Sequence, residues 1–278
     1  MSSADPSTSL ERTYRYLRIG IAGTVVVIFA AVAFAATEVG WLTSVSDYYY
    51  SPARNAFVGA LVAASLALLA LSGRGLERAL LDAAALFAPL IALVPTTLAP
   101  GTVPGVDVPC RFRCFPPAYE ADAANGVLTY LAVGGVVVSI VLLLGLLRQL
   151  SLAVVWGTLA VSVVVLATVG GTWFLAREAF LAQGHFVATI GFFALFAAVA
   201  VLAAFPRAGT PPIPVYRVLY SAIALLLVGV LVAYAVLSSV GGGASLVLVV
   251  EASALVLFFA FWVVQGVEKW TEADPTLR

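Results

Sequence analysis

The chain contains eight separate stretches of mainly apolar residues, each close to the length that a helix needs to cross a membrane. A helix spans the hydrocarbon core of a bilayer with on the order of 20 apolar residues. Hydrophobic residues make up 63% of the chain and charged residues 10%, whereas soluble domains are about half apolar and a quarter charged. A soluble fold has too little interior to bury this much apolar surface. The sequence therefore predicts an all-α fold, a polytopic bundle of eight transmembrane helices.

No connection between these stretches is long enough to separate two domains, so we expect residues 1–278 to form a single integral membrane domain. The first stretch is followed by Glu38-Val39-Gly40-Trp41, which lacks the small residues of a signal-peptide cleavage site. We therefore expect it to remain as a permanent helix. The predicted spans are 19–36, 52–72, 79–98, 126–147, 152–175, 185–205, 216–237 and 245–264, and the longest connection is 99–125.

The basic residues predict the orientation of the chain, because short loops rich in Lys and Arg stay on the cytoplasmic side of a membrane. If the N-terminus is cytoplasmic, ten of the 14 basic residues fall on the inner side. The outer side then holds Arg54, Arg111, Arg113 and Arg177. With eight crossings both termini are cytoplasmic. The prediction is a multi-pass protein of the cytoplasmic membrane, with the connection 99–125 outside.

Both cysteines of the chain, Cys110 and Cys114, lie in that outer connection. An oxidising exterior permits a disulfide between them, which would stiffen the loop. Two free thiols are the alternative. We expect no metal site here, because the loop contains no histidine and the whole chain contains one.

Composition and motifs exclude several classes of function. A formal net charge of zero gives no basic surface for nucleic acid. The sole lysine, Lys269, lies outside the predicted spans, so it cannot form the Schiff base of a retinal protein. The chain has no phosphate-binding glycine loop for ATP. No cofactor is expected. The expected partners are the lipid bilayer and a lipid or small-molecule ligand, and the sequence names no protein partner.

Ionisable residues inside the apolar stretches are the first candidates for a functional site, because a charge at membrane depth is costly unless it is paired or wetted. Glu251 lies within the last stretch, on its outer half. His185 begins the sixth, where an imidazole near a helix N-terminus stays neutral and relays protons, or is only a hydrogen-bonded surface group. Arg78 and Asp82 have the spacing of a structural ion pair within one helix.

A polar motif precedes the second span. Ser51 followed by Pro52 predicts a helix that begins at Pro52, with the serine as cap. Arg54 then lies in the first turn, where the helix dipole disfavours a cation, so a negative partner is expected. The alternative partner is an anionic ligand such as a lipid phosphate. Tyr48, Tyr49 and Tyr50 predict an anchor at the membrane interface or the wall of a binding site. The internal candidates for the partner of Arg54 are Glu38, Asp47, Glu178 and Glu251.

At this motif the chain resembles a prokaryotic, mainly actinobacterial, family of multi-pass membrane proteins without an established function. Members carry a Ser-x-Tyr-Tyr-Tyr/His segment followed by an arginine and Phe-Val-Gly. The matching residues here are Ser46-Asp47-Tyr48-Tyr49-Tyr50, Arg54 and Phe57-Val58-Gly59, after the start Tyr14-Arg15-Tyr16-Leu17-Arg18, with a looser match at Phe261-Trp262-Val263-Val264-Gln265. The resemblance implies a helical integral membrane protein and no particular activity.

These features combine into one hypothesis about function. The outer half of the bundle would gather six residues into a polar pocket for a small polar or amphiphilic molecule, in a carrier, receptor or lipid-handling protein. One alternative is a metal-free membrane enzyme with Glu251 or His185 as general base. Another is an accessory subunit whose polar residues only hold helices together. The six predicted pocket residues are Asp47, Arg54, Asn55, Glu178, His185 and Glu251.

Overall fold

The computed structural model describes residues 9–71, 75–207, 211–240 and 244–270. Across these residues the regular structure is helical, as predicted, apart from one isolated bridge. Seven of the helices are long and apolar enough to cross a membrane. The α-helices are α1 (Ser9–Val39), α2 (Arg54–Leu71), α3 (Gly75–Leu93), α4 (Glu120–Leu146), α5 (Leu152–Leu175), α6 (Arg177–Ala204), α7 (Pro214–Val240) and α8 (Ala244–Glu268), and the short 3-10 turns are η1 (Ser46–Tyr50) and η2 (Pro117–Tyr119).

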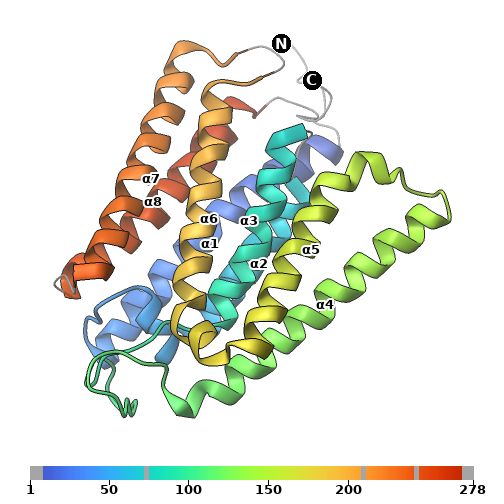
Figure 1. The fold of residues 1–278 in the computed structure, drawn as a ribbon. Coiled ribbons are helices and arrows are strands. Elements are labelled where there is room, and N and C mark those ends of the chain that lie inside the picture. Colours follow the sequence, from blue (N-terminus) through green and yellow to red (C-terminus); the bar gives the residue numbers. More distant parts are fainter. Residues whose placement is uncertain (1–8, 72–74, 208–210, 241–243, 271–278) are drawn as a thin grey trace.

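The helix outside that set of seven is α3, which carries Glu77, Arg78 and Asp82 in its first two turns. It lies in the middle of the bundle, where it packs against α2 and α6 and also touches α4 and α5 (Figure 1). Arg78 Nε lies 3.5 Å from the Asp82 carboxylate, and the Thr158 hydroxyl donates to the same carboxylate at 2.5 Å. The predicted ion pair between Arg78 and Asp82 is confirmed, and the Asp82 side chain is buried inside the protein.

Six helices form a closed ring in which each packs against the next, in the order α1, α2, α3, α6, α7, α8 and back to α1. The contact between α8 and α1 joins the two ends of the described chain. Aromatic side chains fill part of the interior: the ring centroid of Phe258 lies 4.6 Å from that of Phe196 and 5.5 Å from that of Phe192. The ring therefore encloses a core contributed by distant parts of the sequence.

The remaining two helices, α4 and α5, form a hairpin on the outside of α3 (Figure 1). The buried residues of α4 all lie in its first half, between Ala123 and Tyr130. Beyond them, large apolar side chains such as Val136, Ile140 and Leu143 are exposed. A continuous apolar surface of this kind is unfavourable in water and suits contact with lipid.

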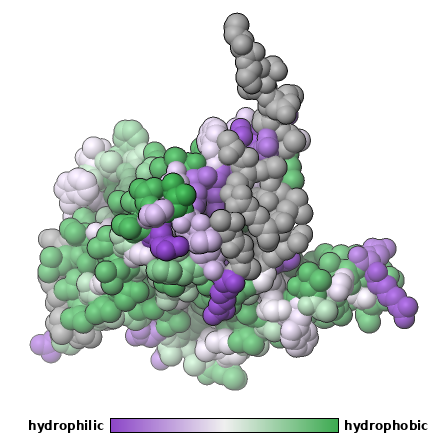
Figure 2. Space-filling model, turned by 90° about the horizontal axis from the view of Figure 1, so that it is seen from above, coloured by the Kyte–Doolittle hydropathy of each residue, from purple (hydrophilic) through white to green (hydrophobic). Residues whose placement is uncertain are grey.

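The start of α1 and the end of α8 lie at the same end of the bundle, here named the terminal end (Figure 1). Arg15 donates to the Trp270 carbonyl at 2.5 Å and Arg18 to the Lys269 carbonyl at 3.3 Å, which satisfies acceptors just beyond the last turn of α8. Seen from this end, hydrophilic residues gather towards the middle of the face and hydrophobic residues surround them (Figure 2). We name the opposite end, which carries η1 and the connection 94–119, the loop end.

Several helix boundaries differ from the predicted spans, and three of the differences lie near the candidate site. α2 begins at Arg54, because Ser51 Oγ accepts the Ala53 N–H at 3.2 Å and closes a turn before the helix. α3 ends at Leu93, since Pro95 follows and disfavours helix in the residue before it. α6 begins at Arg177, so His185 lies inside a helix and not at its start.

Candidate functional site

The segment between α1 and α2 folds back into the loop end of the ring and carries Ser46 to its centre. Gly40, with φ of 78°, allows the chain to turn after α1. The Tyr48 hydroxyl donates to the Gly40 carbonyl at 3.2 Å, and the Tyr50 hydroxyl donates to the Thr96 carbonyl at 2.6 Å. All three tyrosines of η1 are buried, so the predicted interface anchor is wrong. They form a packed frame that holds η1 in place.

Ser46 joins two ionisable side chains from distant helices. Glu251 Oε2 of α8 accepts the Ser46 N–H at 3.0 Å and lies 3.2 Å from Ser46 Oγ. On the other side, Ser46 Oγ lies 3.0 Å from Nε2 of His185 on α6. His185 Nδ1 in turn lies 2.8 Å from the Val94 carbonyl oxygen. The result is a continuous chain of polar atoms from the carboxyl to the carbonyl.

The partners of His185 determine where its hydrogens lie. The Val94 carbonyl can only accept, so Nδ1 carries a hydrogen. In a neutral imidazole Nε2 then has no hydrogen and accepts one from the Ser46 hydroxyl. Because that hydroxyl has a single hydrogen, its contact with Glu251 then requires a protonated carboxyl. If the hydroxyl donates to Glu251 Oε2 instead, Nε2 must carry a hydrogen and the imidazole is charged. The histidine is thus part of a buried network, and the alternative of a surface group is wrong.

Two further ionisable groups lie near the carboxyl of Glu251. Tyr234 of α7 donates a hydrogen bond to it from its hydroxyl. Asp47 is fully buried beside Ser46, accepts a hydrogen bond from the Thr43 hydroxyl, and acts on Glu251 through its charge. Burial raises the pKa of Asp47 above its ordinary value, against hydrogen bonds and a nearby arginine that lower it. Within the described residues, Glu251 forms no ion pair.

A cavity of about 60 Å³ lies inside the ring beside Glu251. All six ring helices and Ser46 contribute to its wall, which is mainly apolar. Among the described residues that line it, Glu251 is the only one with a carboxyl group, and none is basic. The hydroxyls of Thr24 and Thr189 also line the cavity, but each donates to a carbonyl of its own helix, at 2.7 Å and 2.8 Å. The aromatic lining residues are Phe57, Phe192, Phe193, Tyr234 and Phe258.

Arg54 lies away from this cavity. Its guanidinium donates to the Asp122 carboxylate of α4 at 2.8 Å and to the Tyr49 hydroxyl at 2.8 Å, and its carbon centre lies 4.6 Å from the centre of the Tyr49 ring. The partner of Arg54 is therefore internal, but it is none of the four candidates expected from the sequence. Asn55 and Glu178 are exposed.

The six predicted pocket residues thus divide into two groups. The structure brings Asp47, His185 and Glu251 together around Ser46, and leaves Arg54, Asn55 and Glu178 outside the cavity. The physical reason is that Asp122 already compensates the arginine at the start of α2, so no charge from the ring interior is needed there.

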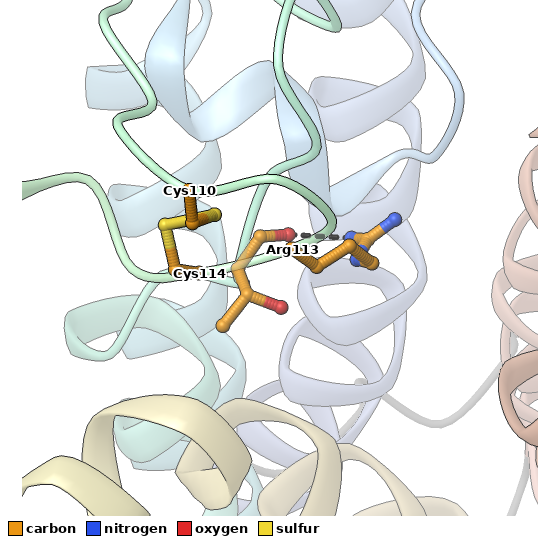
Figure 3. Close-up of a disulfide and its surroundings, with 4 residues drawn as sticks. Cys110, Arg113 and Cys114 are labelled. Carbon is orange, nitrogen blue, oxygen red and sulfur yellow. Dashed lines mark hydrogen bonds between the residues drawn. A yellow bond between two sulfur atoms is a disulfide. The ribbon is translucent and has the colours of Figure 1, made fainter.

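The connection between α3 and α4 covers the loop end. Cys110 and Cys114 are joined by a disulfide (Figure 3). Cys114 also pairs with Leu98 through two backbone hydrogen bonds of 2.9 Å and 3.0 Å. Arg113 extends away from the disulfide and donates to the Thr97 carbonyl at 2.5 Å (Figure 3). The loop is thereby fixed against the stretch that carries the acceptor carbonyl of the histidine.

Sequence reasoning missed two residues of the site. Ser46 was part of the recognised motif, but a serine in a connection gives no indication that it will sit between two buried ionisable groups. Tyr234 lies in a long apolar stretch, where one more aromatic residue is ordinary. Both become visible only when α6, α7 and α8 are placed around η1.

Among the described residues, no group of three or more His, Cys, Asp and Glu side chains lies close enough to hold a metal ion. Comparison of the chain with protein-family models, with curated proteins and with solved structures gave no match. The function is therefore inferred from the geometry of the site.

Proposed function

We propose that the chain is an eight-span protein of the cytoplasmic membrane, with both termini in the cytoplasm and the loop end outside. The gathering of basic residues at the terminal end supports this orientation. A disulfide at the loop end fits an oxidising exterior. We include α3 as the eighth span, because its buried acid Asp82 has partners inside the protein, the guanidinium of Arg78 and the hydroxyl of Thr158.

In this membrane the cavity binds the ammonium group of a small amphiphilic amine, and the protein is a carrier or receptor for it. The observation that carries this proposal is the lining: a single carboxyl, Glu251, stands in a wall of aromatic rings. A carboxylate combined with aromatic faces is the usual way in which proteins hold ammonium ions. The apolar remainder of the wall suits the hydrocarbon part of the ligand.

Hydrogen-bond capacity favours a cation over an anion. The hydroxyl hydrogens of the described lining residues are already used, by Ser46 towards His185 or Glu251, by Tyr234 towards Glu251 and by the two threonines towards their own helices. A carboxylate accepts about four hydrogen bonds, and three groups of the protein contact that of Glu251. The cavity therefore offers an acceptor and no spare donor among these residues, which argues against a phosphate or carboxylate ligand.

The cavity size limits the part of the ligand that it encloses. An apolar cavity of about 150 Å³ holds benzene, so about 60 Å³ accommodates an ammonium group with a few carbons. The best small ligands gain about 1.5 kcal/mol per non-hydrogen atom. A ligand of about five such atoms then binds no more tightly than micromolar.

Ligand-observed NMR on the protein in lipid nanodiscs tests the proposal with three probes of equal length: n-butylamine, n-butanol and butyrate. We expect butylamine to bind best and butyrate not to bind. Glu251→Gln should weaken butylamine binding at least about tenfold, equivalent to about 1.4 kcal/mol. The matched control is Glu178→Gln, which changes an exposed carboxylate and should leave binding unchanged. Binding of butyrate, or full binding by Glu251→Gln, contradicts the proposal.

A metal-free hydrolase is the second candidate function. The 3.0 Å contact of Ser46 Oγ with His185 Nε2, and the fixed Nδ1, resemble a nucleophile with its base. Against it, the Ser46 N–H already donates to Glu251 and is not free to stabilise an oxyanion. Covalent labelling of Ser46 by a fluorophosphonate, absent in Ser46→Ala, would favour the enzyme.

A further inference from the structure

The polar atoms from Glu251 to His185 form an unbroken path that is closed off from solvent. The exposed fractions of Glu251, Ser46 and His185 are 9%, 6% and 4%. Both ends of the path are fixed by backbone groups, the Ser46 N–H at the carboxyl and the Val94 carbonyl at Nδ1. The ammonium site uses only one end of this path, because His185 does not line the cavity.

The same positions of the heavy atoms accommodate two arrangements of hydrogens. In the first, Glu251 is protonated and donates to Ser46 Oγ, and the Ser46 hydroxyl donates to bare Nε2 of His185. In the second, Nε2 carries a hydrogen and donates to Ser46 Oγ, and the Ser46 hydroxyl donates to the carboxylate. Every contact remains a hydrogen bond in both arrangements.

We propose that Glu251, Ser46 and His185 form a proton relay, in which one proton moves between Oε2 of the glutamic acid and Nε2 of the histidine. The serine gives its hydroxyl hydrogen to Nε2 and takes the carboxyl hydrogen in exchange. No proton is gained or lost, and a neutral pair becomes a carboxylate and an imidazolium. Serine is suited to this role because its hydroxyl is both donor and acceptor.

Titratable and charged groups surround the relay on several elements. Tyr234 of α7 donates to Glu251, and Asp47 of η1 acts on Glu251 through its charge. Arg113 of the loop acts on both Asp47 and Tyr234. At His185, the stretch after α3 contributes the Val94 carbonyl. The relay moves a proton within the site, so the net charge of the site does not change. The surrounding groups therefore interact with a change of dipole and not with an added charge.

The relay has a consequence that, unlike the relay itself, rests on the proposed function. An ammonium ion in the cavity lies next to Glu251, while His185 is one hydroxyl farther away. Its attraction to the carboxylate exceeds its repulsion from the imidazolium, since Coulomb energy falls with distance. Ligand binding should therefore move the proton to His185.

The single histidine of the chain allows a direct test, because isotope labelling of histidine gives the NMR signals of His185 alone. The probe is the labelled protein in phosphatidylcholine liposomes, observed by solid-state nitrogen NMR. We expect Nδ1 to be protonated in every sample. In the wild type, Nε2 should have a shift between those of a bare and a protonated nitrogen. In Glu251→Gln, which removes the transferable proton, Nε2 should have the shift of a bare, hydrogen-bonded nitrogen.

Ser46 variants separate the relay from a simple effect of charge. Ser46→Thr keeps the hydroxyl, so the Nε2 shift should still change when Glu251→Gln is added, whereas in Ser46→Ala the added substitution should have no effect. An identical Nε2 shift in wild type and Glu251→Gln, or an Nε2-H tautomer with bare Nδ1, overturns the relay. These two outcomes need no serine variant, so the test holds even where Ser46→Ala does not fold. Addition of butylammonium that leaves the shift unchanged, with the relay otherwise intact, counts against the proposed ligand alone.

Discussion

The helices α7 and α8 are joined by two tyrosine–glutamate pairs, one at each end of the ring, and the two pairs have different surroundings. At the terminal end, Tyr220 donates to Glu268 at 2.5 Å beside the buried guanidinium of Arg18. At the loop end, Tyr234 donates to Glu251. Beside this second pair lies the cavity, in the position that corresponds to Arg18 at the terminal end.

Under the proposed function, this difference separates a structural pair from one that binds a ligand. At the terminal end the chain supplies its own cation, which also reaches the last carbonyls of α8 and joins α1 to α8. At the loop end, Glu251 contacts hydroxyl groups, is linked to His185 through Ser46, and lines the cavity. Under the proposed function, the ligand supplies the cation that the loop-end pair lacks.

Removal of the built-in cation should give the largest effect on stability. Arg18→Met keeps most of the side-chain length but leaves the Lys269 carbonyl and the tyrosine–glutamate pair without the guanidinium. We expect the free energy of unfolding to fall by about 3 kcal/mol, as measured by denaturant unfolding in detergent micelles. Arg12→Met is the control, since Arg12 is exposed on the same helix. An equal effect of the two substitutions would contradict a structural role for the terminal-end pair.

Loss of one hydroxyl from each pair should have a smaller effect on stability and should distinguish the two pairs. Tyr220→Phe removes the hydrogen bond to Glu268 and should cost about 1–2 kcal/mol of stability without changing butylamine binding. Tyr234→Phe removes the hydrogen bond to Glu251 and should weaken butylamine binding several-fold. Unfolding and NMR titration of both variants measure the two quantities. The comparison fails if both substitutions affect binding equally.

The smallest effect should be a dependence of stability on pH that belongs to the loop end. Because burial raises the pKa of Asp47, the folded protein holds the proton more tightly than the unfolded chain does. The free energy of unfolding should therefore fall as pH rises from the ordinary value of 3.8 through the raised pKa. Asp47→Asn should lack this part of the slope, in thermal unfolding followed across that range. A wild-type slope that the variant keeps unchanged would assign it to other groups.

The sequence allowed the helices to be predicted, because long apolar runs have few other solutions in a bilayer. It also marked Glu251 and His185, since an ionisable residue among apolar neighbours is visible without a structure. Closure of the ring between α1 and α8 was not predictable, because nothing local in either helix encodes a contact across the whole chain. For the same reason Asp122 was missed as the partner of Arg54.

The start of α6 was missed for a different reason. Its first two turns, from Arg177 to Gly184, contain polar residues that end an apolar run in the sequence but are compatible with a helix that extends past the membrane. The sequence therefore placed His185 at a helix start, and the structure places it inside α6, facing Ser46.

A structure determined in lipid with butylammonium at saturating concentration shows whether a ligand supplies the cation that Glu251 lacks. We expect density for the ligand inside the ring, with its nitrogen within hydrogen-bonding distance of the Glu251 carboxylate and its carbons against Phe192 and Phe258. An empty cavity at saturating ligand, or butylammonium bound only elsewhere on the protein, would contradict it.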